Sequence, residues 1–293
     1  HEKYVQNRKR VNLELFIARR IAHNGSGNRP GVMVRIAVVA VALSVTVMIL
    51  ALAVIMGFKR EITDRVTGFS AQVEVADLRS AGSIESVPVL RSEQLERTIR
   101  SAGEVVRLTP YAVKGGVVKM PDAILGVMLK GVDGGYEWSF FRDHLLEGEL
   151  PRVGDSIRTK EILISRSVAQ EMGLAPGDKV EMLFVESEKS PRRDRFKVSG
   201  IYATGMDEFD RSVAMTDLRN VQRLADWSSD EVSGYEVTLA DFSQAEDFSR
   251  RLNDMLLDSD REAFWDLTAR SAQERFPTVF DWLKTHDVNA AVI

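Results

Sequence analysis

The sequence contains no cysteine and only four histidines, at positions 1, 23, 144 and 286. The absence of cysteine excludes disulfides, thiol nucleophiles and cysteine-based metal or redox sites. The histidines are scattered along the chain, and none of them forms the close pair that is typical of a metal centre. We therefore expect no metal site in this chain.

Signatures of catalysis are missing as well. No G-x-x-x-x-G-K-[ST] loop occurs, and the glycine-containing stretches at 25–31 and 131–135 lack the lysine that must reach a phosphate. No G-x-S-x-G elbow is present. The acidic cluster Asp207, Glu208 and Asp210 can be compared with paired catalytic carboxylates, but its charged neighbours favour a solvated turn. We predict that the chain is not an enzyme and holds no cofactor of its own.

Charged residues are absent from one long stretch, Ile36–Met56 (IAVVAVALSVTVMILALAVIM). At about 1.5 Å per residue, such a helix covers roughly 30 Å, the thickness of the hydrocarbon core of a bilayer. A buried core helix rarely stays apolar on every face over this length. A cleaved signal peptide would be shorter and would not be followed by the charged Lys59-Arg60-Glu61. The sequence therefore predicts a transmembrane helix over residues 36–57.

The distribution of charge predicts the orientation of this helix. Residues 1–35 carry only two acidic residues and eight basic ones: Lys3, Arg8, Lys9, Arg10, Arg19, Arg20, Arg29 and Arg35. Basic flanks stay in the cytoplasm, so the net acidic remainder is predicted to be exported. An acidic exported domain also argues against nucleic acid as a partner.

Three features around the span suggest further membrane contacts. Residues 12–23 have the pattern of a short amphipathic helix, which either lies on the inner membrane surface or packs on protein. Small residues four apart in the span, such as Ala40 and Ser44, permit close approach of a partner helix. The apolar residues 290–293 are interpreted as the start of a second spanning helix.

Two βαβ-like patterns frame the exported part. The first has a strand at 71–76, a helix at 92–102, a strand-rich stretch at 105–120 interrupted at Gly115-Gly116, and a strand at 123–132. The second has a strand at 234–239, a helix at 244–257 and a strand at 263–268. We interpret them as halves of one α/β sandwich that carries an insertion.

The insertion, 134–229, is predicted to be rich in β-structure. It begins with a strand at 161–164 and a helix at 165–172 that Gly173 terminates. Strands at 179–185 and 195–202 are expected to form a hairpin. The charged segment Glu186–Arg193 is predicted to be the turn between them.

Five segments together resemble a known family. These are MGFKRE at 56–61, EGELP at 147–151, ILISRSVAQEMGLAPGDKVEM at 162–182, VSGIYATGMDEFDRSVAMTD at 198–217 and GYEVTLAD at 234–241. In this order they resemble the permease subunits of the lipoprotein-releasing ABC transporters, the LolC/LolE family, within the FtsX/MacB-like permease superfamily. The resemblance covers about residues 12–293.

This resemblance implies a fold and an organisation. The fold class is a membrane α-helical part plus an α+β part, in which a transmembrane helix is followed by a periplasmic ferredoxin-like (split βαβ) domain with an inserted β-rich subdomain. The implied segments are a cytoplasmic N-terminus (1–35), the first transmembrane helix (36–57), the first half of the periplasmic domain (58–133), the insertion (134–229), the second half (230–272) and the lead-in to a second helix (273–293). The remaining spanning helices and the cytoplasmic loop that docks the ATPase are absent from this sequence.

The resemblance also implies partners. Family members work in the bacterial inner membrane as two permease chains, in a homo- or heterodimer, with an ABC ATPase subunit that holds ATP and Mg²⁺. Lipoprotein-releasing members pass acylated lipoproteins from membrane lipid to a periplasmic carrier. In the family the spans enclose a lipid-accessible cavity, for which Met48, Leu52, Ile55 and Phe58 are the candidates here. The alternative is that these side chains face lipid or a neighbouring helix.

One permease of the family grips the carrier with an extended hairpin loop. The corresponding candidates here are Lys189, Pro191, Arg192 and Arg193, in a turn that is shorter than in the family. Three functions are open: lipoprotein release, which the GFKRE junction and the complete insertion favour, export of peptides or antibiotics, and transmembrane signalling that activates a cell-wall hydrolase. They share one fold, so the fold does not discriminate between them.

Overall fold

The computed structural model describes residues 30–80, 86–120, 123–154, 156–186, 189–206 and 210–290. The amphipathic helix predicted at 12–23 and the last three residues lie outside this part. The chain divides into two compact units: His1–Arg60 with Lys284–Ile293, and Glu61–Leu283. Each unit is described by itself.

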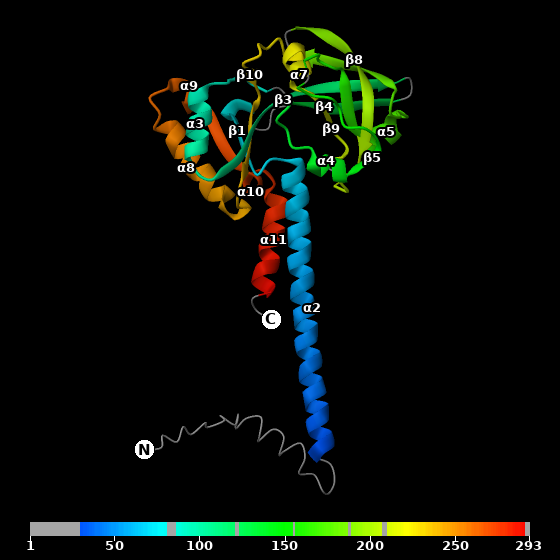
Figure 1. Ribbon diagram of the computed structural model, residues 1–293, viewed down its shortest axis with the longest axis vertical. Helices are drawn as coiled ribbons and strands as arrows, with labels where there is room; N and C mark the ends of the chain where they lie inside the picture. The colour runs from blue at the N-terminus through cyan, green and yellow to red at the C-terminus, as the bar shows by residue number, and fades with distance from the viewer. Residues whose placement is uncertain are drawn as a thin grey trace, which may run out of the picture. The chain divides into compact units, whose positions relative to one another are not determined.

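The first unit contains most of helix α2, Pro30–Phe69, drawn in blue in Figure 1. Within the described residues it is the one helix that is long and apolar enough to cross a membrane. Its most apolar window is 0% buried, so it is not the core helix of a soluble domain. The last residues of helix α11, Pro277–Ala290, also belong to this unit.

The helix is longer than the span predicted at 36–57. Helix α2 continues without a break to Phe69. The sequence permits this because no proline interrupts residues 57–69 and because Glu61 and Arg65 pair one turn apart at 2.7 Å. Ile62 and Val66 repeat at helical spacing and lie in or against one hydrophobic cluster.

The second unit is organised by one ten-stranded sheet. Its order is β12-β1-β11-β3-β4-β9-β6-β8-β5, with β7 paired to β3 and β8. The strands are β1 Val73–Asp77, β3 Val105–Met120, β4 Ala123–Val132, β5 Leu145–Gly148, β6 Glu161–Ser165, β7 Lys179–Glu186, β8 Lys189–Tyr202, β9 Val213–Asp217, β11 Gly234–Leu239 and β12 Leu267–Ser271. A separate pair joins β2 (Val89–Leu90) to β10 (Glu231–Val232).

The four strands β12-β1-β11-β3 are antiparallel and join distant parts of the chain. Val73 of β1 pairs with Val237 on one side and with Ser271 on the other. Helices α3 (Glu93–Ser101) and α8 (Ala245–Leu257) share a buried core with one face of these strands (Figure 1). Helix α3 begins where predicted because the Ser92 side chain caps the amide of Leu95.

Two predictions in this half are wrong. Strand β3 runs unbroken through Gly115-Gly116. Gly116 is needed there for packing, because a Cβ atom would lie 2.6 Å from the Phe184 ring of β7. The strand predicted at 263–268 begins later: helix α9, Glu262–Trp265, buries Phe264, and the strand β12 runs from Leu267 to Ser271.

The other half extends the sheet from β4 through the parallel pair β4–β9. It carries helices α4 (Ser139–Asp143), α5 (Arg166–Met172) and α7 (Leu218–Ala225). Gly173 ends α5 in the left-handed conformation, with φ of 63°, as predicted. The remaining described helices are the turns η1 (Leu78–Ser80) and η2 (Phe242–Gln244) and helix α10 (Ala272–Arg275).

Candidate functional site

The C-terminal end of α2 is built into the core of the second unit. Val66 and Phe69 are 1% and 7% exposed. Val66 packs in a cluster with Phe280 and Leu283 of α11. Phe69 belongs to a different cluster, in which its ring centroid lies 5.9 Å from that of Phe141. The last turns of the helix therefore contribute to two hydrophobic clusters of the second unit.

A polar contact accompanies this packing. Arg65 Nη1 donates a hydrogen bond of 2.6 Å to the carbonyl oxygen of Thr204. The carboxylate of Asp210 accepts hydrogen bonds from the Thr204 amide (3.1 Å), the Thr204 hydroxyl (2.8 Å) and the Gly205 amide (3.2 Å). We call Arg65, Val66, Phe69, Thr204 and Asp210 the junction.

The solvated turn predicted around Asp210 is therefore wrong at this residue. Asp210 is 5% exposed, and its backbone carbonyl additionally accepts a hydrogen bond from the Ser165 hydroxyl. The charged neighbours in the sequence suggested an exposed side chain. In the structure the side chain points inward, because the buried backbone amides of Thr204 and Gly205 need an acceptor. Asp207 and Glu208 lie outside the described residues.

Tyr202 lies beside the junction, where its ring contacts that of Phe69, and its phenol is protonated. Burial raises the pKa of the Tyr202 phenol well above its usual value, and the nearby charge of Asp210 acts in the same direction. The neutral hydroxyl donates a hydrogen bond of 3.0 Å to the Val213 carbonyl. The junction is thus held by packing and hydrogen bonds.

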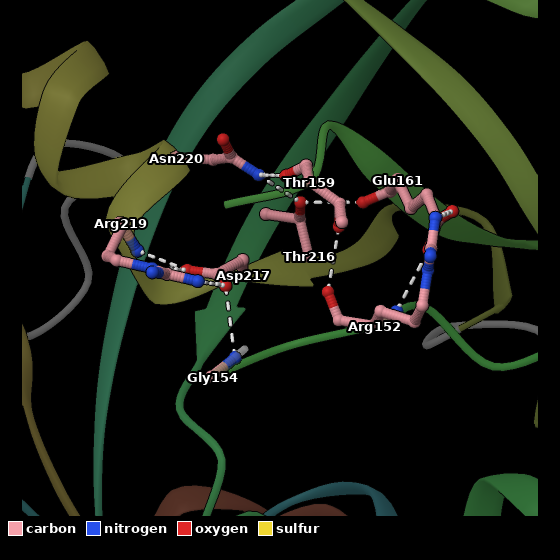
Figure 2. Close-up of polar contacts among 8 residues, drawn as sticks. All are labelled: Arg152, Gly154, Thr159, Glu161, Thr216, Asp217, Arg219 and Asn220. Atoms are coloured by element: carbon pink, nitrogen blue, oxygen red, sulfur yellow. Dashed lines mark hydrogen bonds and ion pairs between the residues drawn. The ribbon is translucent and has the colours of Figure 1, made fainter. Parts of the chain in front are cut away.

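A second polar cluster fixes the loop that follows β5. Figure 2 shows this loop clamp, made by Arg152, Gly154, Thr159, Glu161, Thr216, Asp217, Arg219 and Asn220. Arg152 pairs with Glu161 at 2.8 Å, and the Gly154 amide donates to Asp217 at 3.1 Å. Asn220 donates to the Thr159 carbonyl at 2.9 Å, so helix α7 holds the far end of the loop.

Two carboxylates of the loop clamp are held in the charged form. The side-chain hydrogen bond from Arg152 lowers the pKa of Glu161 against the effect of burial. Burial alone would raise the pKa of Asp217, but the side chain and amide of Arg219 and the Gly154 amide together lower it. Asp217 is 2% exposed and also caps helix α7. No local motif marks this cluster, because its members meet only when β6, β9 and the loop are in place.

The four residues predicted to line a lipid cavity lie along α2, in the first unit. Met48 and Phe58 are 39% and 49% exposed, whereas Leu52 and Ile55 are half-buried. Their role in substrate binding stays a prediction.

The residues predicted to form a carrier-binding turn are instead in a strand. Strand β8 contains all four of them: Lys189, Pro191, Arg192 and Arg193. The strands of the hairpin extend into the segment Glu186–Arg193 that was predicted to be the turn. Backbone pairing continues through Phe184 opposite Arg192. Arg192 is bound to helix α7, with 2.5 Å between its Nη2 atom and Asp226 Oδ2. Arg193 is 74% exposed in its side chain and lies 3.7 Å from Glu181. Of these two arginines, Arg193 is the accessible one.

The part of the chain that the structure describes contains no group of three or more His, Asp or Glu side chains placed to hold a metal ion.

Comparison with known proteins places these features in a family. The family model for the MacB-like periplasmic core domain matches residues 36–255. The lipoprotein-releasing system transmembrane protein LolC of Xylella fastidiosa strain 9a5c is 28% identical over 224 residues, which cover 71% of this chain and 50% of that protein. LolC of Neisseria meningitidis serogroup B is 25% identical over 222 residues, with 73% and 50% covered. The chain thus spans about half the length of these relatives.

Solved structures with similar folds include two transporter domains. The periplasmic region of MacB from Actinobacillus actinomycetemcomitans is 14% identical, covers 71% of this chain and 91% of its own, and gives a TM-score of 0.45. The extracellular domain of the noncanonic ABC-type transporter YknZ, from Gram-positive bacteria, is 15% identical, with 68% and 99% covered and a TM-score of 0.43. Because both TM-scores are low, the family assignment depends on the sequence match alone. On that match, the chain belongs to the MacB-like periplasmic core domain family.

Proposed function

We propose that this chain is part of a permease subunit of an ATP-driven transporter, in which cytoplasmic ATP hydrolysis moves the outer domain. The observation that carries the proposal is the continuity of α2. The helix runs unbroken from Pro30 to Phe69, and its last turns contribute core residues to the outer domain. Because packed cores resist continuous deformation, a displacement of the helix must move or strain the domain that encloses Phe69.

Lipoprotein release is the substrate class that we favour. It is supported by the similarity to proteins named LolC and by the order of the segments from MGFKRE to GYEVTLAD. Removing an acyl chain from lipid costs about 0.8 kcal/mol for each methylene that reaches water, so release needs work from outside the membrane. An ATPase subunit and a second permease chain are the partners that would supply this work.

The proposal includes an arrangement in the inner membrane. The basic N-terminus lies in the cytoplasm, and residues from about Glu61 onward lie in the periplasm. We interpret the half built on β12-β1-β11-β3 as a ferredoxin-like fold, because the chain order β1-α3-β3 and β11-α8-β12 repeats a βαβ unit across one antiparallel sheet. The inserted subdomain is the stretch 134–229 between these units, which contains β5 to β9.

The test is a reconstitution of the native membrane complex that contains this chain. Proteoliposomes carrying the complex and an acylated lipoprotein are given ATP, and soluble lipoprotein is measured together with phosphate release. ATP-dependent appearance of soluble lipoprotein is the expected result. An active ATPase without lipoprotein release contradicts the substrate class, and export of a peptide or activation of a hydrolase in the same vesicles then identifies the alternative.

A hinge in α2 tests the mechanical part separately. Thr63→Gly combined with Asp64→Gly weakens the helix just before the junction, at about 1 kcal/mol for each glycine relative to alanine. Thr63→Ala with Asp64→Ala is the matched control, because it removes the same side chains but keeps the helix. We expect the glycine pair to retain ATP hydrolysis and lose substrate release, and the alanine pair to retain both. Equal release by the two pairs would contradict transmission through α2.

A further inference from the structure

A pocket of about 350 Å³ lies on the sheet face that faces away from α3 and α8. Strand residues alternate between the two faces, so Val73 and Val75 enter the helical core while Glu74 points the other way. Side chains of six strands and of the segments that flank them line the pocket. Those that carry the argument are Ser70, Glu74, Tyr111, Lys130, Glu236 and Arg275.

Two glutamates lie side by side at the base of this pocket. Glu74 of β1 and Glu236 of β11 are direct partners in the antiparallel register, a placement that is destabilising for like charges. Lys130 pairs with Glu236 at 2.5 Å. Arg275 Nε lies 3.0 Å from Glu74, and the Tyr111 hydroxyl donates to the same carboxylate at 2.5 Å. Each acid is therefore already neutralised by its own cation.

The pocket nevertheless keeps an excess of positive charge. A third cation, Arg270, lies 3.5 Å from Glu74 and also lines the pocket. Among the described residues that line the pocket, three cations thus face two carboxylates, which leaves one net positive charge there. Such a charge favours an anionic ligand.

Two buried polar atoms of the pocket have no hydrogen-bond partner among the described residues. They are Ser70 Oγ, in a residue that is 6% exposed, and Arg275 Nη1. An unsatisfied buried group of this kind costs about 1–3 kcal/mol, so its presence in a well-paired network calls for an explanation. Guanidinium groups only donate hydrogen bonds, and therefore the missing partner of Arg275 must be an acceptor.

A purely structural ion-pair network does not explain this arrangement. Such a network would leave the cations matched to the acids and their donors occupied, as Lys130 is by Glu236. A bound cation is also disfavoured, because Arg275 Nη1 could not contact it. The free donors and the charge point to the same class of ligand.

We propose that this pocket binds a small oxyanion, a single phosphate or carboxylate group that accepts hydrogen bonds from Ser70 Oγ and Arg275 Nη1. The site goes beyond the transport function proposed above and does not depend on it. The shared chemistry fits a free anion in the surrounding solution and equally the phosphate of a lipid head group.

Calorimetric titration of the full chain in a neutral detergent tests the site. One arm uses inorganic phosphate, and a second uses a short-chain, water-soluble phosphatidylglycerol. We expect saturable binding in at least one arm, and the arm that binds identifies the source of the anion. Arg275→Gln is expected to weaken binding at least about tenfold, because it removes a charged hydrogen bond. Arg250→Gln, an exposed arginine of α8 paired with Asp247, is the control and is expected to bind as the unaltered chain does.

Ser70→Ala is a second variant, which tests the proposal even if Arg275→Gln impairs folding. Its hydroxyl has no partner to lose, so the thermal midpoint without ligand is expected to stay the same or rise. Anion affinity is expected to fall about tenfold, because the hydroxyl no longer donates a hydrogen bond to the ionised acceptor. Absence of binding in both arms, or binding that neither Ser70→Ala nor Arg275→Gln weakens, overturns the proposal. Both results are independent of whether the complex releases lipoprotein.

Discussion

Arg65 and Thr204 are 139 positions apart in the sequence, and a hydrogen bond of 2.6 Å joins the guanidinium of the first to the backbone carbonyl of the second. Arg65 is anchored on its own helix by Glu61, at 2.7 Å. Thr204 is anchored on the other side by the carboxylate of Asp210. The chain Glu61–Arg65–Thr204–Asp210 therefore connects the end of α2 to a buried turn of the outer domain, beside the packing of Val66 and Phe69.

Arg65→Ala is expected to lower the free energy of unfolding of the outer domain by about 1 kcal/mol, since the hydrogen bond from the partly exposed guanidinium to the Thr204 carbonyl is lost. Glu61→Gln removes only the pair within the helix and is expected to cost no more than about 0.5 kcal/mol. Chemical denaturation of the full chain in detergent, followed by circular dichroism, measures both. A larger loss for Glu61→Gln than for Arg65→Ala would contradict the role given to Thr204.

Asp210→Asn is expected to destabilise the domain by about 2 kcal/mol. Asparagine has one acceptor oxygen where the carboxylate has two, and its amide group would face the backbone amides of Thr204 and Gly205. Asp143→Asn, an exposed position, is the matched control and is expected to change little. Thermal unfolding of the two variants under the same conditions compares them. Equal midpoints would show that Asp210 is not a structural acceptor.

The elements that could be predicted from the sequence are those with a strong local pattern. Strands β4 and β11 have the predicted bounds, because alternation and flanking turns define them without distant contacts. Helices α3 and α5 follow from their serine caps and apolar spacing. Helix α2 extends beyond the predicted span, through residues that include several charges. The packing of Val66 and Phe69 explains why these residues are helical.

The features that could not be predicted from the sequence are those whose contacts are made by residues far away in the chain. Strand β12 is defined by its pairing with β1, and the apolar Phe264 before it turns into the core from a short helix. Asp210 lies in a charged segment, and its burial depends on the amides of Thr204 and Gly205. The pairing of Glu74 with Glu236 follows from sheet register alone, so no spacing in the sequence could reveal it.

Gly68→Ala tests how tightly the end of α2 is packed. A Cβ atom at this position would lie 2.3 Å from Cδ2 of Phe140. We expect a loss of about 1–3 kcal/mol from overpacking, although alanine is the better helix former. In the background Phe140→Ala the same substitution is expected to stabilise by about 1 kcal/mol, because only the helix preference remains. The double-mutant cycle is measured by chemical denaturation, and additive effects would show that the two residues do not meet.

The pH dependence of stability tests the loop clamp. The pKa of Asp217 in the folded protein is lower than its usual value of 3.8. The folded state therefore binds fewer protons than the unfolded state, and the stabilisation is fully present above pH 3.8 and lost as the pH falls from there through the folded pKa. Asp217→Asn keeps a residue that caps α7 but cannot titrate. We expect its thermal midpoint to be lower than that of the unaltered chain at pH 6 and the difference to shrink as the pH falls below 3.8. Because Glu161 titrates in both proteins, the comparison isolates Asp217. A difference that stays constant between pH 6 and pH 2 would mean that the charge of Asp217 does not stabilise the clamp.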